Sequence, residues 1–169
     1  TISKGVILRS VNLGVENYDL KTELESKTGL SVHIKNDAKC AAIGEYQYGE
    51  IKQYNNILFL TLGTGIGGAL ISHGTLMQSD IAGGYEFGHM IIKSDGLKCR
   101  CGKKGCFETY GGILAFKTKV INRLNLSHDI PGPELRKIMD DSMDKISDII
   151  NEYIDDLSIG ISNLINIFE

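Results

Sequence analysis

The sequence predicts an α/β domain in which a mixed sheet is flanked by helices, and three observations lead to this fold class. Residues 57–62 form a short, strongly apolar run of the kind found in buried strands. Residues 38–48 are rich in helix-forming side chains. From residue 132 onward, apolar residues recur at spacings of three and four, which is the period of an amphipathic helix.

The first half of the chain is expected to alternate between strands and a helix. Residues 31–35 alternate polar and apolar side chains and predict a strand. The small alanines of the helix expected at 38–48 would let that helix lie close to a sheet. After the strand at 57–62, residues 64–68 are expected to turn the chain, and residues 69–71 are expected to continue as a paired strand.

The second half is expected to contain a loop region followed by helices. Residues 73–112 are rich in glycine, contain three of the four cysteines and are expected to be mostly loop. Pro133 suits the first turn of a helix. The apolar periodicity from Leu135 to Phe168 predicts either one long helix or two helices separated by a break.

Size and charge exclude several classes of protein. A chain of 169 residues is long enough for one domain with its own core, and 42% hydrophobic and 23% charged residues are typical of a globular protein. The net charge of −3 argues against a protein whose main ligand is nucleic acid. No signal peptide or membrane-spanning run is recognisable, so we expect a reducing, cytoplasmic location in which disulfides are rare.

Three cysteines lie close together at the end of the glycine-rich region, and they predict a metal site. Cys99, Cys101 and Cys106 are separated by short spacers with two glycines, and His89 precedes them. Zinc prefers four such ligands in a tetrahedron, and a closed site of this kind is structural because no position is left for water. The alternatives are three buried free cysteines or one disulfide. Cys40 stands apart, and we expect it to be a small core residue.

Four segments together resemble the ROK family (repressors, open reading frames and kinases). Residues 99–108 have the pattern Cys-x-Cys-Gly-x-x-Gly-Cys-x-Glu, and residues 86–89 are similar to the Glu-x-Gly-His motif of that family. Residues 36–45 and 62–68 resemble its catalytic segment and its second phosphate motif. The similarity runs in order from about residue 5 to the C-terminus. It implies an actin-like ATPase, ribonuclease H-like fold with a zinc loop and long C-terminal helices.

Asp37 has two possible roles. From its position at the expected start of a helix, it would be the N-cap residue. The resemblance instead implies the general base of a sugar kinase, which accepts the proton of the attacking hydroxyl. Asn36 has both donor and acceptor atoms and could bridge two sugar hydroxyls, or it could be an ordinary turn residue.

Glu86 and Glu108 flank the metal motif and are candidates for binding a hexose. Glutamates are usually solvated surface charges, but the family carries sugar-binding residues at both positions. His89 is expected to bind zinc through one ring nitrogen while the other faces sugar or a supporting acceptor. Asn12 is a weaker candidate, since a plain turn would explain it equally well.

The segment after the apolar strand is a candidate phosphate loop. Glycines free backbone N–H groups that can hold phosphate oxygens, and a hydroxyl can add to them. The candidate residues are Gly63, Thr64, Gly65 and Gly67. A glycine-rich β-turn is the simpler alternative. The resemblance to the family favours contact with the phosphates of a nucleotide.

The resemblance implies an ATP-dependent, glucokinase-like hexose kinase that uses ATP with Mg²⁺ and carries structural Zn²⁺. The family's N-terminal Asp-x-Gly-x-Thr phosphate loop and C-terminal adenosine-binding glycines are not recognisable. We therefore expect residues 1–169 to be a single catalytic domain, the larger one, from a longer protein. The alternatives are the sugar-sensing part of a repressor, which would contact nucleic acid through an upstream helix-turn-helix, and a zinc-stabilised module without a ligand. A homodimer is expected, and the sequence does not identify the sugar.

Overall fold

The computed structural model describes residues 2–10, 13–78 and 84–168, and its chain divides into two units. The first unit contains Thr1–Thr61 and Gly68–Glu86, and the second contains Leu62–Gly67 and Phe87–Glu169. Asn12, the weaker sugar candidate, lies outside the described residues.

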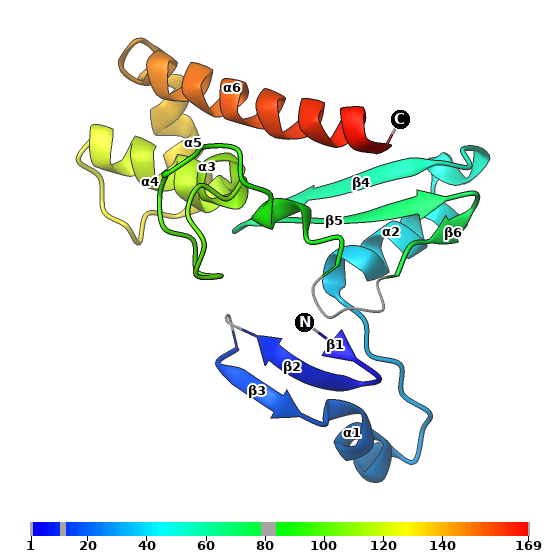
Figure 1. Ribbon diagram of the computed structural model, residues 1–169. Helices are drawn as coiled ribbons and strands as arrows, with labels where there is room; N and C mark the ends of the chain where they lie inside the picture. Colours follow the sequence, from blue (N-terminus) through cyan, green and yellow to red (C-terminus); the bar gives the residue numbers. More distant parts are fainter. Residues whose placement is uncertain (1, 11–12, 79–83, 169) are drawn as a thin grey trace. The chain divides into compact units, whose positions relative to one another are not determined.

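The first unit begins with a three-stranded antiparallel sheet that was not expected from the sequence (Figure 1). Its strands are β1 (Ile2–Ser3), β2 (Val6–Ser10) and β3 (Val15–Tyr18), in the order β1-β2-β3. Ile2 pairs with Ile7, and Ile7 pairs in turn with Tyr18. The strands are short, so their apolar alternation is too brief to identify them from the sequence.

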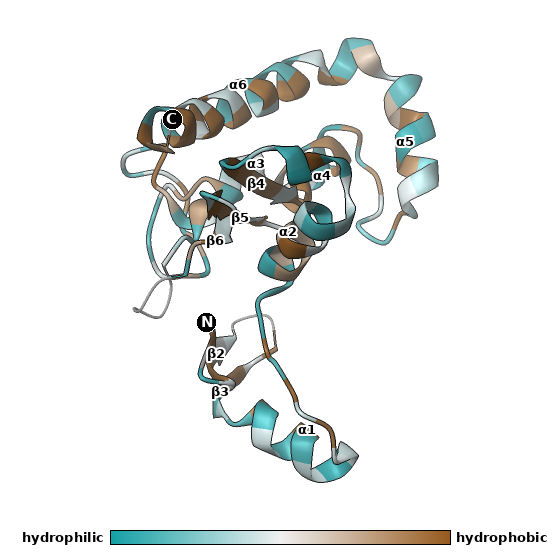
Figure 2. Cartoon of the chain, turned by 90° about the vertical axis from the view of Figure 1, so that its right-hand side faces the viewer, coloured by the Kyte–Doolittle hydropathy of each residue, from teal (hydrophilic) through white to brown (hydrophobic). Residues whose placement is uncertain are grey.

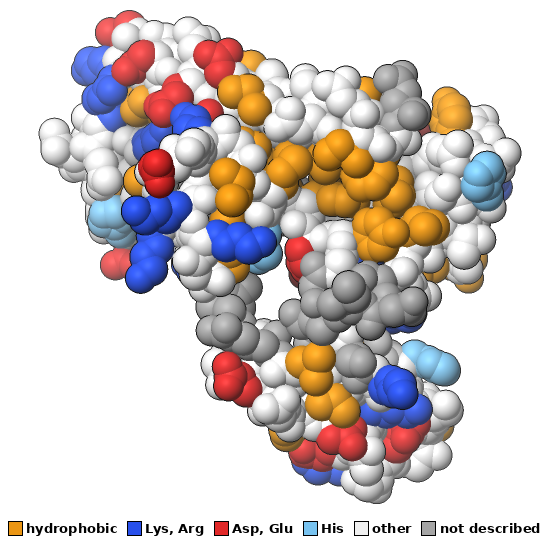
Figure 3. Space-filling model, in the orientation of Figure 1, with side chains coloured by type: hydrophobic (Ala, Val, Ile, Leu, Met, Phe, Trp, Pro, Cys, Tyr) orange, Lys and Arg blue, Asp and Glu red, His pale blue; other side chains and the backbone are white. Residues whose placement is uncertain are grey.

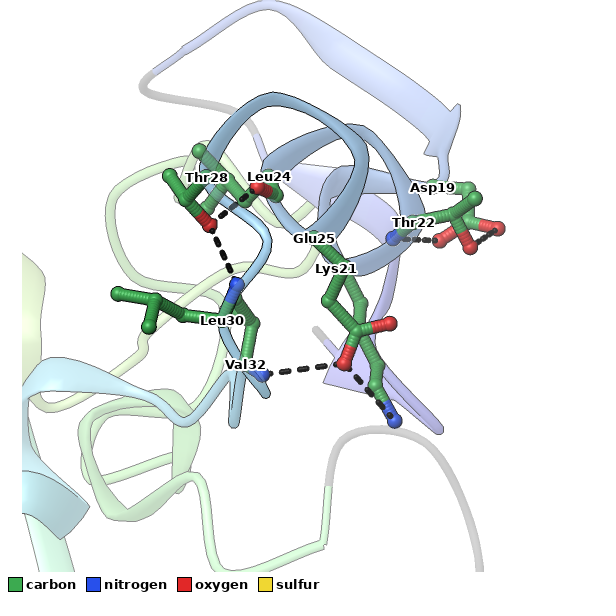
Figure 4. A network of polar contacts seen from close by, with 8 residues as sticks. All are labelled: Asp19, Lys21, Thr22, Leu24, Glu25, Thr28, Leu30 and Val32. Atoms are coloured by element: carbon green, nitrogen blue, oxygen red, sulfur yellow. Dashed lines mark hydrogen bonds and ion pairs between the residues drawn. The ribbon is translucent and has the colours of Figure 1, made fainter.

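Helix α1 (Leu20–Thr28) follows this sheet and is closed by polar side chains at both ends (Figure 4). The Asp19 side chain accepts a hydrogen bond from the backbone N of Thr22 at 3.1 Å, as an N-cap residue does. The Thr28 hydroxyl donates to the carbonyl of Leu24. Gly29 then ends the helix in a left-handed conformation, φ 68°.

The strand predicted at residues 31–35 is wrong, although the burial of its side chains alternates as expected. Val32 and Ile34 are half-buried and their neighbours are exposed, but this segment has no regular secondary structure. The Val32 backbone N–H is satisfied by the Glu25 carboxylate at 3.0 Å instead of by a neighbouring strand. A strand requires a partner for its backbone groups, and side-chain alternation alone cannot supply one.

Helix α2 (Asp37–Tyr48) confirms the predicted Ala-rich helix. Ala38 and Ala42 are buried on one side of it. Cys40 is exposed, so the expectation that it is a core residue was wrong. It lies two residues from each buried alanine, and at helical spacing that position points away from their face. The 3₁₀ turn η1 (Glu50–Gln53) follows α2.

The second sheet has the order β4-β5-β6 (Figure 1). Its strands are β4 (Ile57–Leu62), β5 (Ile66–Ser72) and β6 (Thr75–Leu76). Strand β4 has the predicted bounds, whereas β5 begins at Ile66, earlier than the expected start at residue 69. Ile66, Ala69 and Ile71 of β5 are buried, and this burial explains why the strand extends into the glycine-rich segment.

The second unit is mainly helical, with the 3₁₀ turn η2 (Phe87–His89) at its beginning. The C-terminal apolar repeat forms two helices, which are separated at residues 141–142. This confirms one of the two predicted alternatives. The helices α3 and α4 were not expected from the sequence. The four helices are α3 (Glu108–Gly111), α4 (Ile113–Arg123), α5 (Gly132–Asp140) and α6 (Met143–Phe168).

The core of the second unit lies between α4, α5 and α6. Its buried members are Val120, Ile121, Ile130, Leu135, Ile146 and Ile149. Figure 2 shows apolar residues distributed along α6, in agreement with the helical periodicity of the sequence.

No helix in the described part of the chain combines the length and the apolar character needed to cross a bilayer. Some large apolar side chains stay exposed, among them Ile91 and Leu97, and Figure 3 shows apolar atoms on one face of the molecule.

The contact between Phe107 and Gly160 fixes α6 against the segment that precedes α3. Phe107 is fully buried, and a Cβ atom on Gly160 would fall 2.3 Å from its ring. Glycine therefore allows the helix backbone to approach the ring. Because α6 also packs on α3 and α4, this contact places the end of the cysteine segment on the helical part of the unit.

Candidate functional site

The second unit brings together the four residues that the sequence predicted as metal ligands. One ligand atom from each of His89, Cys99, Cys101 and Cys106 lies within 4.8 Å of all the others. The Cys101 and Cys106 sulfurs are 3.6 Å apart, and the Cys99 sulfur is 3.7 Å from Nδ1 of His89. Two sulfurs bound to one Zn²⁺ at about 2.3 Å lie about 3.8 Å apart in a tetrahedron. The spacing of these atoms is therefore compatible with one shared metal ion.

A short hairpin carries the three cysteines. The backbone N of Cys99 donates to the carbonyl of Lys103 at 2.8 Å, and Lys98 and Lys104 pair across the hairpin. Gly102 turns the chain with φ 95°, a conformation that glycine adopts without strain. These bonds fold the intervening residues into a tight loop and point the cysteines toward one another.

The residues around His89 hold it beside Cys106. The backbone N of Phe107 donates to the carbonyl of Met90 at 2.7 Å, and Ile91 pairs with Cys106. Gly88 lies directly against β5, since a Cβ atom at this position would be 2.1 Å from the carbonyl oxygen of Ile66. The glycine before the histidine is therefore needed for packing.

The pKa values of the three clustered cysteine thiols differ from their ordinary values. All four cysteines of the chain are free. Burial raises the pKa of the Cys99 thiol far above its ordinary value and also raises the pKa of Cys106. Burial alone would raise the pKa of Cys101 as well, but the backbone hydrogen bond from Lys103 and the neighbouring thiols lower it. A bound metal cation compensates the charge of buried thiolates, so thiols in this position can ionise when they bind a metal.

Glu108 lies against this cluster at the start of α3. The Cys99 thiol donates to Oε1 of Glu108 at 3.0 Å, and Nδ1 of His89 is 3.5 Å from the same oxygen. The Glu108 side chain is only 23% exposed, so it is not the solvated surface charge of the simpler interpretation. Nδ1 of His89 faces the sulfurs and Glu108, and this leaves Nε2 as the ring nitrogen for another partner.

The candidate phosphate loop also packs on α3 and on the start of α4. The backbone N of Ile113 donates to the carbonyl of Gly63 at 2.8 Å. A Cβ atom on Gly65 would fall 2.4 Å from Oε2 of Glu108, and one on Gly112 would fall 3.0 Å from the carbonyl of Thr64. The turn between β4 and β5 is thereby held against the helix start that carries Glu108. Gly67, the fourth residue of the loop prediction, belongs to β5.

Asn36, Asp37 and Glu86 belong to the first unit, and all three are exposed. Asn36, not Asp37, is the N-cap of α2, because its side chain accepts a hydrogen bond from the backbone N of Lys39 at 3.2 Å. The cap interpretation of Asp37 was therefore off by one residue. Asp37 is the first helical residue, and its Oδ1 accepts from the backbone N of Ala38 at 2.9 Å.

Sequence reasoning missed the residues that anchor the metal hairpin from outside. Lys93 forms an ion pair with Asp156 of α6 at 2.8 Å, and the hydroxyl of Tyr110 accepts from the backbone N of Leu97 at 2.6 Å. These partners are far apart in the chain and share no motif. The one signal in the sequence was Asp156, a carboxylate that falls at helical spacing among the apolar positions of an amphipathic helix.

The chain matches the ROK family over residues 2–169. It is 41% identical to a glucokinase of Streptomyces coelicolor over 114 residues, which are 68% of this chain and 36% of that protein. It is 35% identical to the xylose repressor of Bacillus subtilis over 109 residues, which are 64% of this chain and 28% of the repressor.

A solved structure of a ROK family glucokinase from Streptomyces griseus, in complex with glucose and AMPPNP, superposes with a TM-score of 0.86 at 29% identity. The alignment covers 98% of this chain and 58% of the glucokinase chain. This likeness confirms the predicted actin-like ATPase, ribonuclease H-like fold class. The chain thus spans a third to three fifths of the length of the glucokinases that it matches.

Proposed function

Because the chain belongs to the ROK family, we propose that it is the catalytic part of an ATP-dependent, glucokinase-like hexose kinase. Its similarity to glucokinases, one of them solved with glucose and AMPPNP, supports this proposal. The observation that carries it is the contact between Gly65 and Glu108. This contact joins a glycine-rich turn suited to phosphate with a half-buried carboxylate suited to sugar hydroxyls.

In the proposed reaction, a hexose hydroxyl attacks the γ-phosphorus of ATP, the bond from that phosphorus to the β–γ bridging oxygen breaks, and ADP leaves. Asp37 accepts the hydroxyl proton as general base. Its carboxylate lies at the N-terminus of α2, where the partial positive charge of the helix favours an anion. Its Oδ2 is available for the proton, since Oδ1 accepts from Ala38.

The hexose would be held by Asn36, Asp37, Glu86, His89 and Glu108. The oxygen of Asn36 is used by the helix cap, so its amide NH₂ is the group left for a sugar oxygen. Glu108 would accept hydrogen bonds from neighbouring hydroxyls. His89 would contribute through Nε2, since Nδ1 faces the cysteine sulfurs.

Zinc would be held by His89, Cys99, Cys101 and Cys106. When bound in such a four-ligand site, Zn²⁺ supplies structural cross-linking and no reactive water. The residues of this chain would then keep Glu108 in place, because its carboxylate contacts both Cys99 and His89. The phosphates of ATP, accompanied by Mg²⁺, would be bound by the backbone N–H groups of Gly65 and Gly67 and by the hydroxyl of Thr64. The backbone N–H of Gly63 donates to the carbonyl of Gly65 at 3.0 Å, so Gly63 would contribute by shaping the turn.

For the whole protein, we propose that residues 1–169 form a single catalytic domain of a longer, cytoplasmic protein that assembles as a homodimer. The similarity to glucokinases over only part of their length supports the larger size.

A second candidate function is sugar sensing in a transcriptional repressor. The 35% identity to the xylose repressor of Bacillus subtilis favours this alternative. A repressor needs neither a general base nor a contact to the γ-phosphate. The presence of Asp37 and of the glycine-rich turn at residues 63–67 therefore makes the kinase the better supported function.

The two functions are separated by assays on the full-length protein. Purified protein is mixed with ATP, Mg²⁺ and glucose, mannose, fructose or N-acetyl sugars, and ADP formation is measured with coupling enzymes. A kinase produces ADP in proportion to hexose. Calorimetric binding of a hexose without ADP formation would instead support sensing, and the absence of any hexose binding would contradict both functions.

A further inference from the structure

Lys93 and Asp156 form an ion pair that differs from the other ion pairs of the second unit in its burial. Nζ of Lys93 is 2.8 Å from Oδ1 of Asp156, whose side chain is 3% exposed. The other carboxylate oxygen, Oδ2, has no hydrogen-bond partner among the described residues. Arg123 and Asp148 form a pair of similar length between α4 and α6, but their side chains are 44% and 64% exposed. Lys93 is therefore the main partner of a buried charge, and losing it would be costly.

Lys93 occupies the segment that connects two parts of the metal cluster. It lies between His89 and Cys99 in the chain. Its backbone N is 3.3 Å from the carbonyl of Gly105, the residue before Cys106. A Cβ atom on Gly105 would fall 1.8 Å from the Lys93 carbonyl oxygen, so the two backbones are in direct contact. A shift of Lys93 would therefore move the backbone on both sides of the cysteine hairpin.

Tyr110 supports the same arrangement from α3. Nζ of Lys93 lies 4.5 Å from the centre of the Tyr110 ring, a distance typical of a cation–π contact. The hydroxyl of Tyr110 accepts from the backbone N of Leu97, two residues before Cys99. The same short helix begins with Glu108, whose carboxylate touches Cys99 and His89. Lys93 is thus held between α3 and α6 at the base of the hairpin.

We propose that Lys93 and Asp156 are positioning residues of the metal site, and that they set how firmly the hairpin holds its ion and how the ligands are arranged around it. This inference rests on the metal assignment in the proposed function. Neither side chain contacts the ligand atoms. Asp156 acts by holding Lys93. Lys93 acts through the contact between its own backbone and the backbone of Gly105.

The test measures metal release and the geometry of the metal site in the variants Lys93→Met and Asp156→Asn. Lys93→Met keeps most of the apolar stem and removes the charge, whereas Asp156→Asn removes the buried carboxylate and leaves a lysine that is 35% exposed to solvent. We expect zinc transfer to a chromogenic chelator to be at least tenfold faster in both variants. We also expect the visible absorption bands of the cobalt-substituted protein to shift. Lys93→Arg should restore slow release and the original spectrum.

The matched control is the exposed pair, altered as Arg123→Met and Asp148→Asn, which should leave release and spectrum unchanged. Circular dichroism separates an effect on the site from unfolding. The inference is overturned if Lys93→Met folds, releases zinc at the rate of the unaltered protein and shows the same cobalt spectrum. It is also overturned, together with the metal assignment, if the unaltered protein binds no stoichiometric zinc or cobalt. If the protein lacks kinase activity but binds metal as described, the proposed function is contradicted and the inference about Lys93 and Asp156 still stands.

Discussion

The backbone of Gly65 lies against the carboxylate of Glu108, so closely that a Cβ atom on Gly65 would fall 2.4 Å from Oε2. Gly65→Ala should therefore displace the Glu108 side chain or the turn. Hydrogen bonds to a charged group typically contribute about 1.5–3 kcal/mol, so hexose affinity should fall about tenfold or more. Calorimetry with the preferred hexose measures this loss. Gly132→Ala is the control, because nothing lies within 4 Å of its Cβ position, and it should bind hexose normally. Equal affinity in the two variants would contradict the role of Glu108.

Asp37→Asn should separate binding from catalysis. The amide keeps the size of the side chain but cannot accept the hydroxyl proton, so turnover should fall by about 100-fold or more while hexose affinity changes little. The coupled ADP assay and calorimetry measure the two quantities on the full-length protein. Asp129→Asn, an exposed change outside the candidate site, should retain full turnover. Near-normal turnover of Asp37→Asn would show that another group takes the proton.

Cys101→Ser should remove a metal ligand and loosen the hairpin. The serine hydroxyl is a poor zinc ligand, and without the ion the hairpin keeps only its backbone hydrogen bonds and the contacts made by Lys93, Tyr110 and Glu108. We expect less than stoichiometric zinc by elemental analysis and faster hydrogen exchange in residues 86–108. Cys40→Ser, which alters an exposed cysteine, should change neither quantity. A fully zinc-loaded Cys101→Ser variant would exclude this ligand set.

Zinc affinity should fall as the pH is lowered. Burial raises the pKa values of Cys99 and Cys106, so both thiols carry protons at neutral pH that the ion must displace. Lower pH favours the protonated thiols, and higher pH favours the thiolates that bind the metal. With at least these two protons released, the apparent affinity should change by at least about 100-fold for each pH unit near neutrality. Competition with a chelator of known affinity at several pH values measures the slope, and a flat profile would be inconsistent with thiolate ligands.

Gly160→Ala should destabilise the second unit. The added Cβ atom would meet the fully buried Phe107 ring at 2.3 Å and force α6 away from it. Overpacking of this kind costs about 1–3 kcal/mol. Urea unfolding measures the change in the free energy of unfolding. Ser158→Ala, on an exposed position of the same helix, should be neutral or slightly stabilising. An unchanged stability of Gly160→Ala would mean that α6 approaches Phe107 less closely.

The features that depend on neighbouring residues were predictable from the sequence. The metal ligands lie within one short stretch, so spacing and chemistry were sufficient to place them together. The apolar strand β4 and the C-terminal helical repeat followed from periodicity. The N-cap of α2 was misplaced by one residue, because Asn36 and Asp37 are both good caps and local sequence does not separate them.

The features that depend on distant partners were not predictable. Residues 31–35 show the alternation of a strand but find no neighbouring strand. The exposure of Cys40 depends on which face of α2 is covered, and composition does not determine that face. The pairing of Lys93 with Asp156 depends on how α6 lies on the hairpin. Each of these outcomes is decided by tertiary packing, which overrides local preference.

All four ligands of the proposed zinc site come from residues 89–106. Closing so short a segment around an ion costs little conformational entropy compared with joining distant parts of a chain. The ion can therefore be captured as soon as Cys106 has emerged from the ribosome, before helix α6 has been synthesised.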